Sequence, residues 1–228
     1  LIDVTNDLVY VIVSDTVSTT ANNSAVYTFS TGFTAATTPT YTEISGQNPG
    51  TNIYSGALNE AFYNGGAGSM FVCGPAAASA TPTLYQIEIS ALGVLGTVHT
   101  GMPLATGTAL CSPVTAFFNT NASEDKIFVS VTTLGKATAP QSCPTAGAGC
   151  IMSFDVTSVT AAAPITTTTP AASGHTTAAG GTSAIVVDGS SAATGASQVY
   201  FTPLADQACT TSGGTGGCAI QASQSALN

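Results

Sequence analysis

The chain has very few charged side chains, no tryptophan and no arginine. Only 6% of its 228 residues are charged, and its two cations are Lys126 and Lys136. Charged residues make up about a quarter of an ordinary globular protein. Because proteins neutralise phosphate groups with lysine and arginine, a formal net charge of -9 argues against a nucleic-acid partner. The same shortage of cations argues against binding to an anionic membrane surface.

Long apolar runs and helical periodicity are missing as well. No apolar run approaches the ~18 residues that a membrane-spanning helix needs, so we expect no membrane insertion. No longer segment has the spacing of an amphipathic helix, so we expect no helix of more than two turns. The chain does not start with methionine, lacks a signal peptide and opens within a patterned run. We therefore expect it to be a mature or processed piece.

The chain does contain many short runs rich in Val, Ile, Tyr, Phe and Thr, separated by clusters of Gly, Pro, Ser and Ala. Such runs are typical of short strands. Four runs are alike, and their central residues Tyr10, Phe71, Phe128 and Tyr200 lie 61, 57 and 72 residues apart. Each has one run before it and another after it, and three of the four units end with a fourth, more polar run. Four strands in a repeat of about 60 residues are typical of a propeller blade.

We therefore predict an all-β, propeller-like fold with three four-stranded blades, one incomplete blade and at least twelve strands. Residues 1–228 form a single propeller or the C-terminal part of a larger one, with blades of roughly 1–50, 51–105, 106–175 and 176–228. The expected strands, in chain order, are LIDVTND, LVYVIVSD, AVYTFST and PTYTEIS; NEAFYNG, SMFVCGP, TLYQIEIS and VLGTVHT; TAFFNTN, KIFVSVT, CIMSFDV and PITTTTP; and SAIVVDGS, QVYFTPL and CAIQASQ.

Two similar cysteine loops, QSCPTAGAGC and QACTTSGGTGGC, occupy the same place in the third and fourth units, between the second and third strands. Disulfides Cys143–Cys150 and Cys209–Cys218 would close them. The alternative is that these thiols are free or bind a metal, although zinc sites prefer closer cysteine pairs.

The remaining cysteines, Cys73 and Cys111, belong to the second unit and to the start of the third. A disulfide between them would join neighbouring blades. Because an even number of cysteines then leaves no free thiol, we expect an oxidising compartment, and so an extracellular or cell-surface protein.

Residues that carry chemistry are scarce. Neither His99 nor His175 lies near a cysteine or carboxylate in the sequence, and there is no G-x-S-x-G elbow, calcium loop or phosphate loop. We therefore expect no catalytic residue, no cofactor and no metal. Glycosylation sequons occur at Asn22 and Asn121.

Four carboxylates lie on or beside the first strand of a unit, where they could face a central channel: Asp3, Asp7, Glu60 and Asp188. In one interpretation Asp7 and Asp188 make turns at the ends of their strands, where an aspartate bonds to its own backbone. In the other, carboxylates of this set serve a glycosidase, which needs two of them within about 10 Å of each other in an open pocket.

The segments GTSAIVVDGSSAATGASQVYF and CTTSGGTGGCAIQASQSALN, which cover 181–201 and 209–228, resemble the closing parts of secreted bacterial β-propeller repeat proteins. Their layout is similar to that of the YVTN and NHL repeat families. The resemblance implies a secreted propeller whose natural C-terminus lies close to Asn228.

The last unit ends on its third strand, which leaves an uncovered strand edge. An exposed edge is a template for another strand. We expect that strand from the remainder of a larger wheel or from a neighbouring copy, in a homo-oligomer. The function predicted is a non-enzymatic, extracellular structural or interaction propeller, the subunit of a surface assembly or filament. The alternative is a carbohydrate-active enzyme or sugar-binding propeller. The expected interaction edge consists of Ala219, Ile220, Gln221, Ala222 and Ser223.

Overall fold

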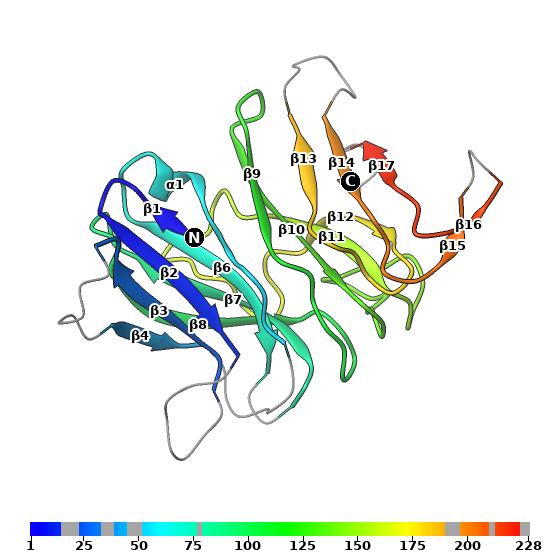
Figure 1. Ribbon diagram of the computed structural model, residues 1–228, viewed down its shortest axis with the longest axis horizontal. Coiled ribbons are helices and arrows are strands. Elements are labelled where there is room, and N and C mark those ends of the chain that lie inside the picture. Colours follow the sequence, from blue (N-terminus) through cyan, green and yellow to red (C-terminus); the bar gives the residue numbers. More distant parts are fainter. Residues whose placement is uncertain are drawn as a thin grey trace.

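In the computed structural model, four antiparallel sheets follow one another along the chain and pack face to face (Figure 1). The structure describes residues 1–14, 23–32, 39–44, 52–76, 79–189, 197–209 and 213–223. Over these residues the all-β prediction is confirmed, because they form 17 strands and a single helix of four residues.

The first three sheets each contain four strands, and neighbouring strands in the sheet are also neighbours in the chain. The fourth sheet contains three strands, and a two-stranded hairpin stands beside it. The first sheet consists of β1 (Ile2–Asp3), β2 (Leu8–Val13), β3 (Ala25–Ser30) and β4 (Thr40–Glu43). The second consists of β5 (Ala57–Leu58), β6 (Gly68–Pro75), β7 (Pro82–Ile89) and β8 (Leu95–Pro103). The third consists of β9 (Thr115–Asn119), β10 (Glu124–Val131), β11 (Cys150–Asp155) and β12 (Ala172–Thr177), and the fourth of β13 (Val186–Asp188), β14 (Gln198–Phe201) and β17 (Ile220–Ser223); the hairpin is β15 (Gln207–Ala208) with β16 (Thr215–Gly216).

The strand expected at NEAFYNG is wrong, because this segment forms the one-turn helix α1 (Glu60–Tyr63) and the strand β5 comes just before it. Hydrogen bonds to side chains take the place of strand pairing in this segment. The Asn59 side-chain oxygen accepts the Ser69 N–H at 2.9 Å, and the Glu60 N–H donates to the Asp125 carboxylate at 2.8 Å. Such side-chain partners offer the backbone an alternative to strand pairing.

The strand expected at PITTTTP is also wrong, because the fourth strand of the third sheet is β12, further along the chain. The threonine run instead makes a turn, in which the Thr166 N–H donates to the Thr169 carbonyl at 2.8 Å. The Thr166 hydroxyl accepts the N–H groups of Thr168 and Thr169 at 3.2 and 3.1 Å. His175 consequently lies in the strand β12.

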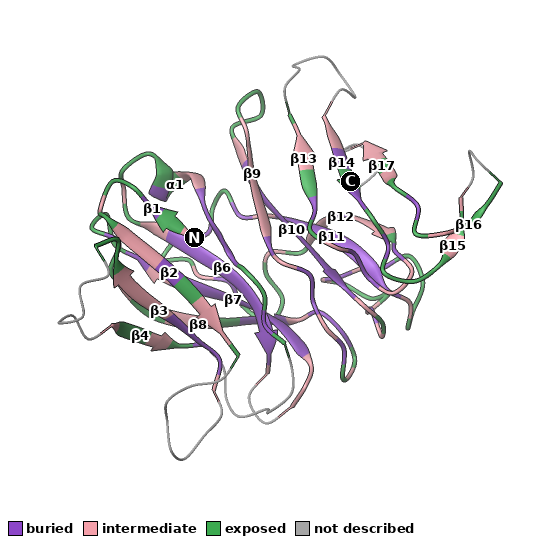
Figure 2. Ribbon diagram, in the orientation of Figure 1, coloured by how far each residue is buried: buried purple, intermediate pink, exposed green. Residues whose placement is uncertain are grey.

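Alternating side chains bury both faces of the two middle sheets. In β6, Met70 and Val72 point into the apolar cluster shared with the first sheet, whereas Phe71 and Cys73 point into the cluster shared with the third. A third cluster lies between the third and fourth sheets. Figure 2 shows the result: β6, β7, β10 and β11 are mostly buried, whereas the first and last sheets carry exposed stretches. The stack therefore has two outer faces, one at each end.

Buried polar side chains bind the connecting loops to this stack. The Gln86 amide donates to the Ser69 hydroxyl at 2.8 Å, and its oxygen accepts the Ile165 N–H at 2.9 Å. The Gln141 amide, which begins the first cysteine loop, donates to the Pro103 carbonyl at 2.7 Å and so ties this loop to the second sheet. Because buried polar groups without partners are costly, these bonds define the paths of the loops.

Candidate interaction surface

All six cysteines are paired in disulfides, which indicates an oxidising environment. The pairs are the three that the repeat predicts, with Cα–Cα distances of 6.1, 5.9 and 5.7 Å: Cys73–Cys111, Cys143–Cys150 and Cys209–Cys218.

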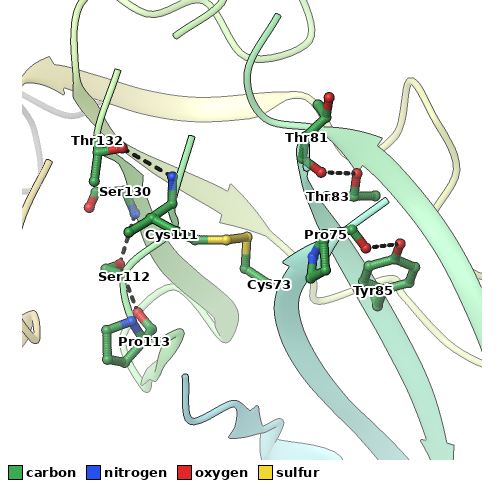
Figure 3. The surroundings of a disulfide bond; sticks show 11 residues. Cys73, Pro75, Thr81, Thr83, Tyr85, Cys111, Ser112, Pro113, Ser130 and Thr132 are labelled. Atoms are coloured by element: carbon green, nitrogen blue, oxygen red, sulfur yellow. Dashed lines mark hydrogen bonds between the residues drawn. A yellow bond between two sulfur atoms is a disulfide. The ribbon is translucent and has the colours of Figure 1, made fainter. Parts of the chain in front are cut away.

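The Cys73–Cys111 disulfide connects two sheets (Figure 3). Cys73 lies in β6, and Cys111 lies in the segment that leads to β9. That segment is hydrogen-bonded to the third sheet, since the Ser130 N–H donates to the Ser112 hydroxyl at 2.9 Å. The Leu110 N–H likewise donates to the hydroxyl of Thr132, just after β10, at 3.0 Å. The covalent bond thus staples the second sheet to the third, as expected for neighbouring units of the repeat.

The four carboxylates that could face a channel are held in local structure. Asp3 is buried and accepts the N–H groups of Thr5 and Asn6, both at 3.1 Å, in the turn after β1. Asp7 completes this turn with a positive φ of 55°. Asp188 lies in β13. The hollow between β1 and α1 contains Asp3 but neither Asp7 nor Glu60 nor Asp188. Asp3 and Asp7 thus belong to a turn, whereas Asp188 lies in a strand and Glu60 in α1, and the described hollow does not bring two of the four together.

A fifth carboxylate, that of Asp125, binds the backbone of Glu60, and no pattern in the sequence predicts this contact. Asp125 is buried at the start of β10, and its carboxylate accepts the Glu60 N–H at 2.8 Å across the two sheets. Burial raises the Asp125 pKa, and the charges of Glu60 and Asp155 add to the rise, against the lowering effect of that hydrogen bond. Within the described part of the chain, no three His, Cys, Asp or Glu side chains are grouped to hold a metal ion. The Asp125 carboxylate therefore anchors α1.

Replacing Asp125 with asparagine should change how stability depends on pH. Because the folded protein holds the Asp125 pKa above its unfolded value, this carboxyl lowers the free energy of unfolding as the pH rises. We expect the free energy of unfolding of Asp125→Asn, relative to the wild type, to increase between about pH 3 and pH 7. Urea unfolding at several pH values measures it, with Glu124→Gln as the control. A relative stability that decreases over this range would contradict the assignment.

The fourth sheet ends on β17, and no described strand pairs with its outer side. The expected edge is thus present in part: Ile220–Ser223 form the strand, whereas Ala219 lies just before it. β14 pairs with β17 on its inner side (Figure 1). In an antiparallel pair, backbone groups of alternate residues point toward the partner, so only half of the N–H groups of β17 point outward.

The outer face of this fourth sheet is partly apolar. Val186 is 61% exposed, and Tyr200 stands opposite it in the β13–β14 ladder. Together with Gln221 they line a hollow that also reaches Ile220, which packs against the inner cluster. Among the described residues, this apolar face and the outer side of β17 lie together at one end of the stack.

The outer face of the first sheet is apolar across three strands. Val11 of β2 lies beside Tyr27 of β3, and Tyr27 lies beside Tyr41 of β4. Val9 of β2 likewise lies beside Phe29 of β3. The Tyr27 ring centroid lies 5.4 Å from that of Tyr41, which is 52% exposed. Exposed apolar faces of this kind mark interaction sites.

No protein-family model, curated protein or solved structure matches the chain. The resemblance to secreted propeller repeat proteins therefore stays a prediction. In the described ranges, no helix combines the length and the apolar character that crossing a membrane requires. Of the two sequons, Asn121 is exposed in the turn between β9 and β10, and Asn22 lies outside the described residues.

Proposed function

We propose that this protein is a non-enzymatic, extracellular subunit of a structural or interaction assembly, built as part of a β-propeller. The observation that carries the proposal is a series of four-stranded sheets that ends in a sheet of three strands, in which no described strand pairs with the outer side of β17. Propeller blades are four-stranded meanders packed face to face. A missing fourth strand leaves backbone groups that another strand can pair with.

Covalent and charge features support the extracellular setting. Three disulfides persist only under oxidising conditions, and one of them joins two sheets that otherwise associate through an apolar cluster. The chain has only two lysines and no arginine, so little positive charge is available to bind nucleic acid or anionic lipid. A protein partner, recognised through strand pairing and apolar contact, is compatible with this composition.

The carbohydrate-active alternative has less support. Its carboxylates do not share a described hollow, and Asp3 is engaged by its own turn. Phe62, which together with Tyr63 could have formed a sugar-stacking platform, is buried in the cluster between the first two sheets. Enzymatic hydrolysis of a glycoside would require two cooperating carboxyl groups at one site.

Hydrogen exchange in β17 tests the proposal. At high protein concentration we expect the outward N–H groups of Ile220–Ser223 to be protected, and to exchange once dilution dissociates the assembly. The N–H groups of Gln198–Phe201 in β14 are the internal control, because this strand is paired on both sides and should stay protected at both concentrations. A stable monomer at high concentration whose outward β17 amides exchange freely would overturn the proposal.

A further inference from the structure

We propose that a second copy of this chain packs the outer face of its first sheet onto the outer face of the fourth sheet, in the way that successive sheets pack within one chain. The inference rests on the proposed assembly function and names both the partner and the contact. Within the described residues, the first and fourth sheets share no apolar cluster. Val11 and Tyr41 on the first face are exposed, as are Val186 and Tyr200 on the fourth, so each face has apolar side chains available to another copy.

Equivalent residues of the repeat show that Tyr200 occupies a position meant to be covered. Tyr10, Phe71 and Phe128 are 2%, 0% and 1% exposed, and each belongs to the cluster between its own sheet and the next. Tyr200 is the fourth member of this series but is 38% exposed. No described sheet follows the fourth one, so its ring lacks the neighbour that the other three have.

The residue after each of these aromatics faces the opposite way, toward the preceding sheet. Val72, Val129 and Phe201 are 0%, 0% and 4% exposed in the clusters with that sheet. Val11 is the first member of this second series, and it is 39% exposed because no described sheet precedes the first one. The stack thus lacks a following neighbour at Tyr200 and a preceding neighbour at Val11, and one contact between two copies supplies both.

Each of the two faces carries apolar side chains and one carboxylate, which is Glu43 at the end of β4 on the first face and Asp188, on the same side of β13 as Val186, on the fourth. Because the chain has a net charge of -9, copies associate best through surfaces that carry little charge. On the face of the first sheet, Glu43 at the end of β4 is held by the Asn23 amide at 3.0 Å. Val11 and Tyr41 are exposed on this face, and the opposite face offers a hollow lined by Val186 and Tyr200. Because the contact is head-to-tail, repeated copies close a ring or extend into a filament.

Complementary single substitutions test this contact. Val11→Lys places a charge on the outer face of the first sheet, and Tyr200→Glu places a charge on the outer face of the fourth sheet. We expect the wild type to self-associate, and each variant to weaken that association about thirtyfold or more, as expected for a contact at the centre of an interface. Leu92→Lys is the matched control and should associate like the wild type, because Leu92 lies in an exposed turn whose neighbours contact the inner side of the first sheet, not its outer face. Light scattering on a size-exclusion column measures the masses, and circular dichroism checks folding.

Mixing the two variants in equal amounts separates the possible arrangements. In a head-to-tail contact the mixture should form a dimer, because the intact Tyr200 face of the Val11→Lys protein meets the intact Val11 face of the Tyr200→Glu protein. If the mixture does not form a dimer and the Tyr200→Glu protein still associates by itself, the contact is symmetric and joins two first sheets. That outcome would overturn the inference. If both variants associate like the wild type while β17 is protected, the face contact fails and the proposed function stands. A monomeric wild type overturns the inference, and freely exchanging β17 amides would then overturn the proposed function too.

Discussion

Replacing Phe128 with alanine should lower the free energy of unfolding by about 3–5 kcal/mol, whereas Tyr200→Ala should lower it by about 1 kcal/mol or less. The two residues hold the same place in successive units of the repeat. Phe128 is fully enclosed between the third and fourth sheets, where Val199 and Phe201 belong to the same apolar cluster. Removing its ring leaves a cavity that the packed sheets cannot fill. The ring of Tyr200 already faces solvent in the single chain.

Urea unfolding followed by circular dichroism measures both variants at a protein concentration low enough to keep the chain monomeric. Phe71→Ala provides a second buried member of the series, between the second and third sheets, and should resemble Phe128→Ala. Similar losses for Phe128→Ala and Tyr200→Ala would mean that the outer face of the fourth sheet is covered within one chain. That result would contradict the arrangement of sheets described above.

Removing the Cys73–Cys111 disulfide by a double alanine substitution should lower the free energy of unfolding by about 4 kcal/mol. Its two cysteines are 38 residues apart in the sequence, so the bond removes much of the freedom of the unfolded chain. The Cys143–Cys150 bond spans only 7 residues, and its removal should cost about 2 kcal/mol. The longer bond also joins two sheets (Figure 3). The shorter bond closes a single loop.

Chemical denaturation of both double variants, followed by circular dichroism because the chain lacks tryptophan, gives the two free energies. The Cys143→Ala/Cys150→Ala protein is the matched control, since it also replaces two buried cysteines within the same apolar cluster. Equal losses, or a larger loss from the shorter bond, would argue against the account based on chain entropy.

Several parts of the fold were predictable because they depend on near neighbours in the sequence. The strand around Phe71 is a short, continuously apolar run flanked by glycine and proline, so the sequence places it well. The cysteine loops could be paired because the same spacing recurs in two units. The failures have local causes too. The side-chain bonds of Asn59 turned an expected strand into a helix, and those of Thr166 turned another into a loop.

The candidate surface was harder to predict. That the last strand, Ile220–Ser223, has no fourth strand of its unit after it followed from counting strands, but the two outer faces did not. Asp125 meets Glu60 from 65 residues away, and no pattern within either segment announces that contact. Nothing in the run around Tyr200 distinguishes it from the run around Phe128, because alternation specifies which side chains share a face and not what covers that face.

By itself, the sequence determined the class of fold, most of the strands and the three cysteine pairs. The strands and two of the pairs follow from spacing within the repeat, whereas Cys73–Cys111 was the pair that remained. Only the tertiary structure decided which members of a repeated series are buried. Tyr10, Phe71 and Phe128 are covered and Tyr200 is not, although all four begin from the same pattern. The physical reason is that a side chain on a sheet is buried only when a second sheet lies at packing distance. Whether a second sheet lies there depends on the position of the unit in the stack and not on the residues of that unit.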